Sequence, residues 1–394
     1  MSGDLLRLAP SPQTSLVVVS TVVTTVALLS LARKTLNPTP PKIIVSPRDS
    51  LLPDLSKEEQ ESLPYPPDIF PGARDVESPY GTIRVYEWGP ESGRKVLLIH
   101  GISTPCVSLG SISRLLVEKK NCRVMLLDLW GRGYSDSPDL PYDSRLYTTE
   151  ILLALTSSPL AWTPDGFSII GYSLGGGIAA DFAAYFPNLV KGLALLAPSG
   201  LLRPHHLGWS SKVMFSGLVP QRILESSIRK RLTGGPAGTN TVQKLRGEKP
   251  TETVAAGPED AVDAVVAEAT TGASDPHFNS VPLNKDKPHL TVESAVKWQI
   301  QHNKGFIRSF ASSIKYSSIS GHAQTWERLR NFGSPVVILA GRTDPIIIPT
   351  ELEEDAKAAI GDENVEWRVL EGGHEFPITQ PERVVQEIWG VWEA

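Results

Sequence analysis

Residues 167–180, FSIIGYSLGGGIAA, decide the fold of this chain. The first four residues form an apolar run with two adjacent isoleucines, which is typical of a β-strand buried on both faces. From Ile178 onward the pattern suits a helix. The pentapeptide between them, Gly171 to Gly175, matches G-x-S-x-G, the spacing of a sharp turn from a strand into a helix.

At the tip of such a turn Ser173 would stand exposed above the sheet. The first backbone N–H groups of the following helix point at the same place and would stabilise negative charge that develops there. A glycine-rich turn with a capping serine is the alternative interpretation of the pentapeptide taken alone. Whether Ser173 is a nucleophile or a capping residue therefore depends on whether the rest of the chain supplies a base and a carboxylate for it.

The composition is that of an ordinary globular protein. The chain has 394 residues, enough for one large domain or two with a substantial core. A formal net charge of −5, without a dense basic block, argues against a nucleic-acid partner. Two cysteines, Cys106 and Cys122, are too few for a disulfide framework and lack metal-ligand spacing, so we expect both to be buried small side chains.

An apolar segment predicts that residues 1–36 form an N-terminal membrane anchor. Residues 16–32 carry no charge for 17 residues and are followed by Arg33 and Lys34. As a helix they would span roughly 25 Å, short of the ~30 Å hydrocarbon core but workable if basic side chains reach the interface. The later basic residues would keep the catalytic domain in the cytosol. A secretory signal peptide is the alternative, because Ser30-Leu31-Ala32 resembles a cleavage site.

Shifts in composition mark the other domain boundaries. Residues 37–74 are rich in proline, as expected of an extended linker. Apolar strands alternate with helical stretches over residues 75–200 and again over 325–394, which predicts a mostly parallel central sheet flanked by helices. Residues 201–324 lack a buried-strand run and predict an inserted helical cap or lid. Its expected helical pieces include residues 261–269 and 292–316.

The strand predictions rest on short runs of strand-like sequence, and the first of them alternates as an edge or antiparallel strand does. These runs are residues 81–88, 96–100, 123–128, 167–170, 191–197, 336–340 and 365–370.

A serine hydroxyl is a poor nucleophile near neutral pH and needs a base that a carboxylate orients. In open parallel sheets such groups lie in loops beyond the carboxyl ends of strands. Asp344 and His374 each follow directly after a predicted strand. Taken singly, an aspartate before proline is typical of a turn and a histidine after two glycines is typical of a surface loop. Their shared position favours Ser173 as nucleophile, His374 as base and Asp344 as orienting acid, in the chain order of a nucleophile elbow.

An oxyanion hole needs two backbone donors, one from the residue after the nucleophile and one from the loop after an early strand. We expect the backbone N–H groups of Leu174 and Ile102, in that order, to be these donors. Asp128 and Asp136 are expected to bond loop backbone, and Cys106 has no paired base. The remaining candidates are the cap histidines, which we expect at the surface: His205, His206, His277, His289, His302 and His322.

The ordered set HGIS, DLWGRGYSD, GYSLGG, GRTDP and GGHEFP resembles the α/β-hydrolase superfamily, in its cap-bearing esterase, lipase and C–C hydrolase branch. The resemblance covers residues 75–200 and 325–394. It implies an α/β-hydrolase fold, the triad of Ser173, Asp344 and His374, and no cofactor. The serine at the elbow argues against the epoxide hydrolase and haloalkane dehalogenase branches, which use aspartate there. The segment after His374 lacks the acidic residue of the acyltransferase pattern.

The sequence therefore predicts a membrane-tethered serine hydrolase that cleaves an ester or related acyl bond through an acyl-enzyme. Its expected partners are a small, apolar ester or acyl substrate and the membrane. Two alternatives stay open: a non-catalytic member of the fold that binds a ligand or partner, and a C–C bond hydrolase or acyltransferase of the same fold.

Overall fold

A computed structural model describes residues 12–36, 42–206, 208–215, 218–233, 281–284 and 286–393. The chain divides into two compact units, Met1–Lys42 and Ile43–Ala394. The helix expected at residues 261–269 and the candidate His277 lie outside the described residues.

The first unit contains helix α1 (Pro12–Leu36). Across the part of the chain that the structure describes, no helix combines the length and the apolar character needed to cross a membrane. The predicted anchor at residues 16–32 is therefore wrong, and the membrane as partner and the cytosolic placement derived from it fall with it. The charge-free run covers only 17 residues, fewer than the ~20 that a bilayer requires, and five of them are serine or threonine.

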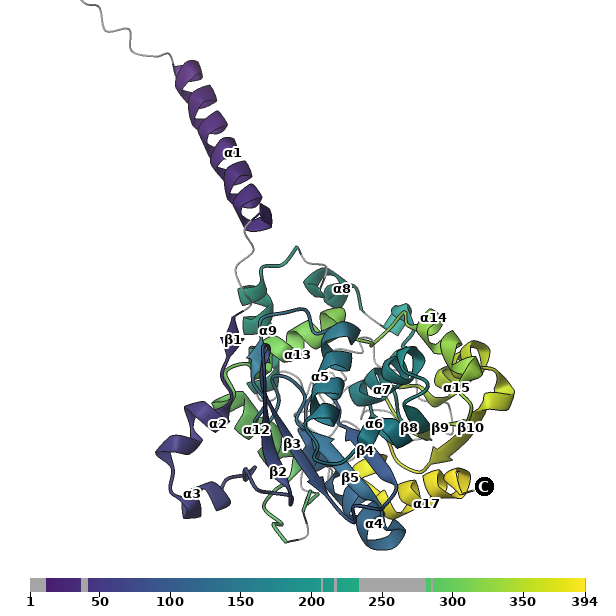
Figure 1. Ribbon diagram of the computed structural model, residues 1–394. Coiled ribbons are helices and arrows are strands. Elements are labelled where there is room, and N and C mark those ends of the chain that lie inside the picture. Colours follow the sequence, from purple (N-terminus) through teal and green to yellow (C-terminus); the bar gives the residue numbers. More distant parts are fainter. Residues whose placement is uncertain are drawn as a thin grey trace, which may run out of the picture. The chain divides into compact units, whose positions relative to one another are not determined.

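The second unit is built on an eight-stranded sheet of order β10-β9-β8-β7-β4-β5-β3-β2 (Figure 1). Its parallel part comprises β4 (Lys95–Ile99), β5 (Arg123–Leu127), β7 (Phe167–Tyr172), β8 (Val190–Leu196), β9 (Val336–Gly341) and β10 (Val365–Leu370). Two antiparallel strands complete one edge, β2 (Ala73–Ser78) and β3 (Gly81–Trp88). The predicted fold class, a mostly parallel sheet flanked by helices, is confirmed.

Burial explains why the central strands were visible in the sequence. Every residue of β7 and of β9 is buried, because helices cover both faces of the sheet there. A strand in that position must be apolar throughout, so it appears as an unbroken apolar run. β2 lies at the edge with alternating exposure, and its polar sequence ARDVES hides it.

Helices pack in pairs against the sheet. α4 (Gly110–Lys120) contacts α17 (Pro381–Trp392), and α5 (Ser144–Thr156) contacts α7 (Leu174–Tyr185). Figure 1 shows strands β4 and β5 between the two pairs. The other described α-helices of the core are α6 (Trp162–Asp165), α14 (Ala323–Trp326), α15 (Pro349–Ile360) and α16 (Phe376–Thr379).

Residues 43–72, here called the N-terminal arm, belong to this compact unit, which begins at Ile43 and not near residue 75. The arm opens with β1 (Ile43–Ile44), which pairs antiparallel with β6 (Ser137–Pro138), and continues through α2 (Pro47–Ser50) and α3 (Lys57–Glu61). Tyr65 and Phe70 are buried in the core. The prolines of this segment suggested an extended linker, but the segment is packed, because its aromatic side chains are buried against the core.

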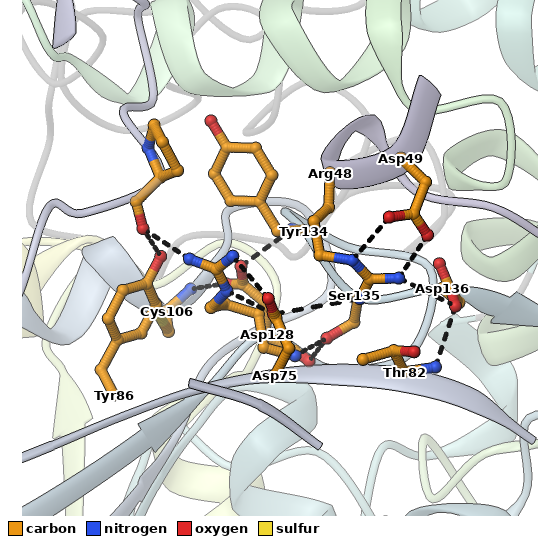
Figure 2. Close-up of polar contacts among 12 residues, drawn as sticks. Arg48, Asp49, Asp75, Thr82, Tyr86, Cys106, Asp128, Tyr134, Ser135 and Asp136 are labelled. Atoms are coloured by element: carbon orange, nitrogen blue, oxygen red, sulfur yellow. Dashed lines mark hydrogen bonds and ion pairs between the residues drawn. The ribbon is translucent and has the colours of Figure 1, made fainter. Parts of the chain in front are cut away.

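Figure 2 shows polar contacts that fasten the arm. The Ser46 N–H donates to Asp136 Oδ1 at 2.8 Å, and the Arg48 guanidinium lies 3.5 Å from the other oxygen of the same carboxylate. Farther along, the Pro67 carbonyl accepts from Tyr86 Oη at 2.9 Å and from Arg84 Nη1 at 2.8 Å. Asp136 thus fastens the start of the arm, and Arg84 and Tyr86 of β3 fasten its second half.

The described helices between β8 and β9 include α8 (Trp209–Phe215), α9 (Gln221–Thr233), α12 (Val292–His302) and α13 (Phe306–Tyr316). α12 and α13 contact residues 130–136, which follow β5 and are here called the glycine-rich loop. Asn303 Nδ2 donates to the Gly133 carbonyl at 3.1 Å, and Ser309 Oγ donates to the Gly131 carbonyl at 3.2 Å. The glycine-rich loop is therefore the surface on which these two cap helices rest.

Candidate active site

β7 passes into α7 through one strained residue, Ser173. Its φ of 55° and ψ of −119° lie in a region that residues with a side chain rarely adopt. The surroundings hold this conformation: the Ser173 N–H donates to the Leu196 carbonyl at 2.9 Å, and its carbonyl accepts from Ser199 N at 3.0 Å. Strain held in place by such bonds is characteristic of functional sites.

The flanking glycines have a steric reason. A Cβ on Gly171 would lie 2.3 Å from the Gly175 carbonyl oxygen, and a Cβ on Gly175 would lie 2.1 Å from the Ile99 carbonyl oxygen. Strand, turn and helix approach too closely here for any side chain. The G-x-S-x-G spacing therefore builds the sharp turn that the sequence predicts.

His374 and Asp344 lie just beyond the carboxyl ends of β10 and β9. His374 Nδ1 is 2.7 Å from Asp344 Oδ2, and the two side chains are only 1% and 0% exposed. Asp344 Oδ1 accepts from the backbone N–H groups of Ile346 and Ile347, at 2.8 and 2.9 Å. A carboxylate bonded in this way accepts from Nδ1, so Nδ1 carries the proton and Nε2 is the basic nitrogen of His374.

Tyr172 brings His374 next to the elbow. The Tyr172 hydroxyl donates to the His374 carbonyl at 3.0 Å, and the two rings lie 5.3 Å apart between centroids. Since Ser173 follows Tyr172 directly, the structure places the three residues predicted as a triad at the same edge of the sheet. Tyr172 itself was not predicted, because an aromatic residue inside the pentapeptide carries no distinctive signal.

The loop after β4, residues 101–104, passes close to the serine. A Cβ on Gly101 would lie 3.4 Å from Ser173 Cβ and 3.8 Å from Ser173 Oγ. This is the loop that carries Ile102, the predicted second oxyanion donor, and we call it the oxyanion loop. Leu174, the predicted first donor, begins α7 directly after the serine.

His100 holds the start of the oxyanion loop. Its Nε2 lies 2.9 Å from Leu129 N, and its Nδ1 lies 2.7 Å from the Gly101 carbonyl oxygen. A backbone N–H can only donate, so Nε2 accepts and Nδ1–H donates to Gly101. Burial, aided by the charge of Arg132, lowers the pKa of His100 to about 3 and keeps the ring neutral. Sequence reasoning recognised His100 only as part of the His-Gly motif.

A cavity of about 110 Å³ opens beside Ser173. Apolar side chains from the oxyanion loop, α7, the cap and the loop after Asp344 form most of its wall, among them Ile102, Leu174, Phe215, Ile314, Ile346 and Ile347. A second hollow of about 10 Å³ also touches Ser173 and is lined by Ser103, Thr104 and Tyr172. Val292 and Ile378 also line this hollow, so the serine faces a mainly apolar cavity and a much smaller hollow with a mixed polar and apolar lining.

The other polar candidates have structural roles, as predicted. Asp128 is fully buried, and it accepts from Cys106 N at 3.1 Å and from Tyr134 N at 3.0 Å (Figure 2). The Tyr65 hydroxyl lies 3.0 Å from both oxygens of the same carboxylate. Asp136 accepts from one N–H of the arm, that of Ser46, and from one N–H of β3, that of Thr82. Both cysteines are buried, and burial raises the pKa of the Cys106 thiol well above its ordinary value. Cys106 is thus a protonated thiol and not a competing nucleophile.

Among the described residues, His205, His206 and Glu351 lie close enough together, within 4.8 Å, to hold a metal ion. His206 Nε2 is 2.8 Å from Glu351 Oε2, but the Arg203 guanidinium lies 3.8 Å from that same oxygen and would repel a cation. The cluster is therefore better explained as an ion-pair network.

The expectation that the cap histidines lie at the surface holds only in part. His205 and His289 are exposed. His322 is half-buried, with its Nδ1 3.2 Å from Asp181, and this hydrogen bond raises the pKa of His322. A partner on α7 explains why this histidine is withdrawn from solvent.

Comparisons with known proteins agree with this fold. The model of the alpha/beta hydrolase family matches residues 96–387. A serine hydrolase-like protein of Danio rerio is 33% identical over 126 residues, 32% of this chain and 37% of that protein. An uncharacterized protein of Mycobacterium tuberculosis is 28% identical over 182 residues, 44% of this chain and 51% of that protein. The matches thus span about a third to a half of the length of these curated relatives.

Solved structures with low sequence identity share the fold. A naproxen esterase from Bacillus subtilis superposes with a TM-score of 0.55 at 19% identity, over 84% of this chain and 94% of that one. The esterase RhEst1 from Rhodococcus gives a TM-score of 0.53 at 18% identity, over 82% and 99%. The family match and the serine hydrolase-like relatives together support hydrolase activity. Since the family model matches most of its length, this chain belongs to the alpha/beta hydrolase family.

Proposed function

We propose that this chain is a serine hydrolase that cleaves an ester or related acyl bond through a covalent acyl-enzyme. The observation that carries the proposal is the buried 2.7 Å contact between His374 Nδ1 and Asp344 Oδ2, at the sheet edge where the strained Ser173 lies. The structural neighbours named as esterases and the relatives named as serine hydrolase-like proteins support the same chemistry.

In the first half of the reaction, Ser173 Oγ attacks the substrate carbonyl carbon while His374 Nε2 takes the hydroxyl proton. The carbonyl oxygen becomes an oxyanion, which accepts hydrogen bonds from the backbone N–H groups of Leu174 and Ile102. His374 then passes its proton to the leaving oxygen, the carbon–oxygen bond breaks and the alcohol departs. A water molecule, activated by the same histidine, releases the acid and restores the serine.

The cavity beside Ser173 supports an apolar substrate. Its wall is mainly isoleucine, leucine and phenylalanine, so an apolar acyl or alcohol group bound there would leave water with a favourable free energy. We therefore propose small apolar esters as the substrate class.

The test is labelling with a fluorophosphonate probe, which reacts with an activated serine. The wild-type chain should be labelled, and Ser173→Ala should lose both the label and ester turnover while it still folds. Ser199→Ala is the matched control, because Ser199 also lines the cavity but its hydroxyl donates to the Ser318 carbonyl at 2.6 Å. This variant should keep the label. A folded wild-type chain that takes no label would favour the non-catalytic, ligand-binding alternative.

A further inference from the structure

Side chains hold three consecutive carbonyl groups of the oxyanion loop. His100 donates to Gly101, Arg132 Nε donates to Ile102 at 3.2 Å, and Gln299 Nε2 donates to Ser103 at 2.7 Å. In a trans peptide the carbonyl and the N–H point in opposite directions. The Gly101 carbonyl shares its peptide with the Ile102 N–H, so the bond from His100 sets where that N–H points. The bonds from Arg132 and Gln299 hold the next two peptides of the same loop.

Gln299 differs from the other two because it comes from the cap helix α12. Its side chain is fully buried, and its Oε1 accepts from Gly133 N at 2.9 Å while its Nε2 bonds Ser103. The orientation of the amide follows from its partners, one backbone donor and one backbone acceptor. One cap side chain thus joins the oxyanion loop to the glycine-rich loop.

The position of α12 does not depend on Gln299 alone. The Trp298 ring lies 5.7 Å from the Tyr65 ring of the arm and 5.2 Å from the Tyr134 ring of the glycine-rich loop, between centroids. Asn303, the residue after the helix, donates to the Gly133 carbonyl. These contacts should keep α12 in place when Gln299 is replaced.

The second carbonyl is also connected to the cap. Arg132, which bonds Ile102, is held by Nη1 to the Trp130 carbonyl at 2.9 Å and by Nη2 to Ser313 Oγ at 2.8 Å. Ser313 lies on α13. Two cap helices therefore act on neighbouring peptides of one four-residue loop.

We propose that Gln299 is a positioning residue for the oxyanion hole, through which the packed cap holds the loop that carries the Ile102 donor. The inference rests on the proposed function. Removing an oxyanion donor costs about 10²- to 10³-fold in kcat, and misplacing a catalytic group by about 1 Å can cost 10²-fold. Replacing one of the three side chains that bond this loop should therefore lower kcat roughly tenfold or more. The loss should fall on kcat, because the oxyanion exists only in the transition state.

The experiment compares Gln299→Leu and Gln299→Glu with Gln301→Leu and Gln301→Glu in the full chain, on a short-chain p-nitrophenyl ester. Gln301 is the same residue type on the same helix, but it is exposed. Gln299→Leu should lower kcat at least tenfold with KM within threefold of the wild-type value. Both Gln301 variants should match the wild type.

Gln299→Glu adds a readout that a merely structural role would not move. Its ionised carboxylate can accept from Gly133 N but cannot donate to the Ser103 carbonyl, whereas the protonated acid can do both. Burial raises the pKa of such a carboxyl. Relative to wild type, its kcat should therefore recover as the pH falls from 8 to 5.5.

Equal kcat in Gln299→Leu and Gln301→Leu would overturn the proposal. So would a lowered kcat accompanied by a large fall in melting temperature and no recovery of Gln299→Glu at low pH, since that pattern is a packing defect. Failure of the proposed function would be recognised separately, by a folded wild-type chain without label or turnover. The positioning role would then fall with it.

Discussion

Replacing Asp344 by asparagine should remove nearly all turnover, because the surroundings dictate how the new amide is oriented. Asp344 Oδ1 accepts from the N–H groups of Ile346 and Ile347, at 2.8 and 2.9 Å. In the variant the amide oxygen must occupy this place, since an NH2 group there would face two donors and lose both bonds. The amide NH2 then takes the position of Oδ2, 2.7 Å from His374 Nδ1.

The consequence is a change of tautomer. An NH2 group donates, so Nδ1 of His374 must accept and its proton moves to Nε2, the nitrogen that should take the proton of Ser173. The corresponding substitution in a serine protease triad lowers kcat about 10⁴-fold, which is about 5.4 kcal/mol in activation free energy. The backbone hydrogen bonds are retained, so the melting temperature should shift by only a few degrees.

The assay is kcat on a p-nitrophenyl ester together with the rate of fluorophosphonate labelling, with folding followed by circular dichroism. Asp362→Asn serves as the control, because Asp362 precedes the amino end of β10, at the opposite end of that strand from His374, and its side chain is 77% exposed. It should behave as wild type. A loss below tenfold in Asp344→Asn would refute the reasoning, since another group would then have to orient His374.

Two further predictions concern stability. Burial lowers the pKa of His100 to about 3, against 6.5 in the unfolded chain, so the unfolded chain binds a proton below pH 6.5 and the folded chain does not. This group should therefore lower the free energy of unfolding by about 2 kcal/mol between pH 7.5 and pH 5. Urea unfolding at the two pH values should show that His100→Asn lacks this component, and an equal loss in both proteins would contradict the assignment. A form that starts at Asp49 should be about 2 kcal/mol less stable than one that starts at Lys42, because Asp136 loses the hydrogen bond from Ser46 N. Equal melting temperatures would show that this start of the arm contributes nothing.

The central strands could be predicted because burial on both faces demands unbroken apolar runs. The run at residues 336–340 coincides with all but the last residue of β9. The strand predicted at residues 365–370 coincides with β10, which lies at the sheet edge and is only partly buried, so its sequence mixes apolar and charged residues. The start of α7 was predicted at Ile178, whereas the helix begins at Leu174. Its first turn contains three consecutive glycines, and their poor helix propensity hides a helix that tertiary packing imposes.

The sequence alone could not show the packing of the N-terminal arm. Its prolines are compatible with both an extended linker and a packed segment, and the decision lies with distant partners. Tyr65 finds Asp128 and Tyr134, and Ser46 finds Asp136. No local pattern announces such pairings, because each depends on residues more than 60 positions away in the chain.

The sequence by itself determined the local chemistry of the candidate site: a serine on a turn that only glycines can flank, and an aspartate and a histidine placed directly after two predicted strands. These features depend on neighbouring residues, so they can be recognised in the order of the chain. The tertiary structure decided which groups hold the loop around the serine. Gln299 reaches Ser103 across 196 positions, and Arg132 reaches Ser313 across 181. Such contacts arise only when the cap packs on the core, because a buried amide or guanidinium takes whichever backbone and hydroxyl partners the fold brings within hydrogen-bond distance.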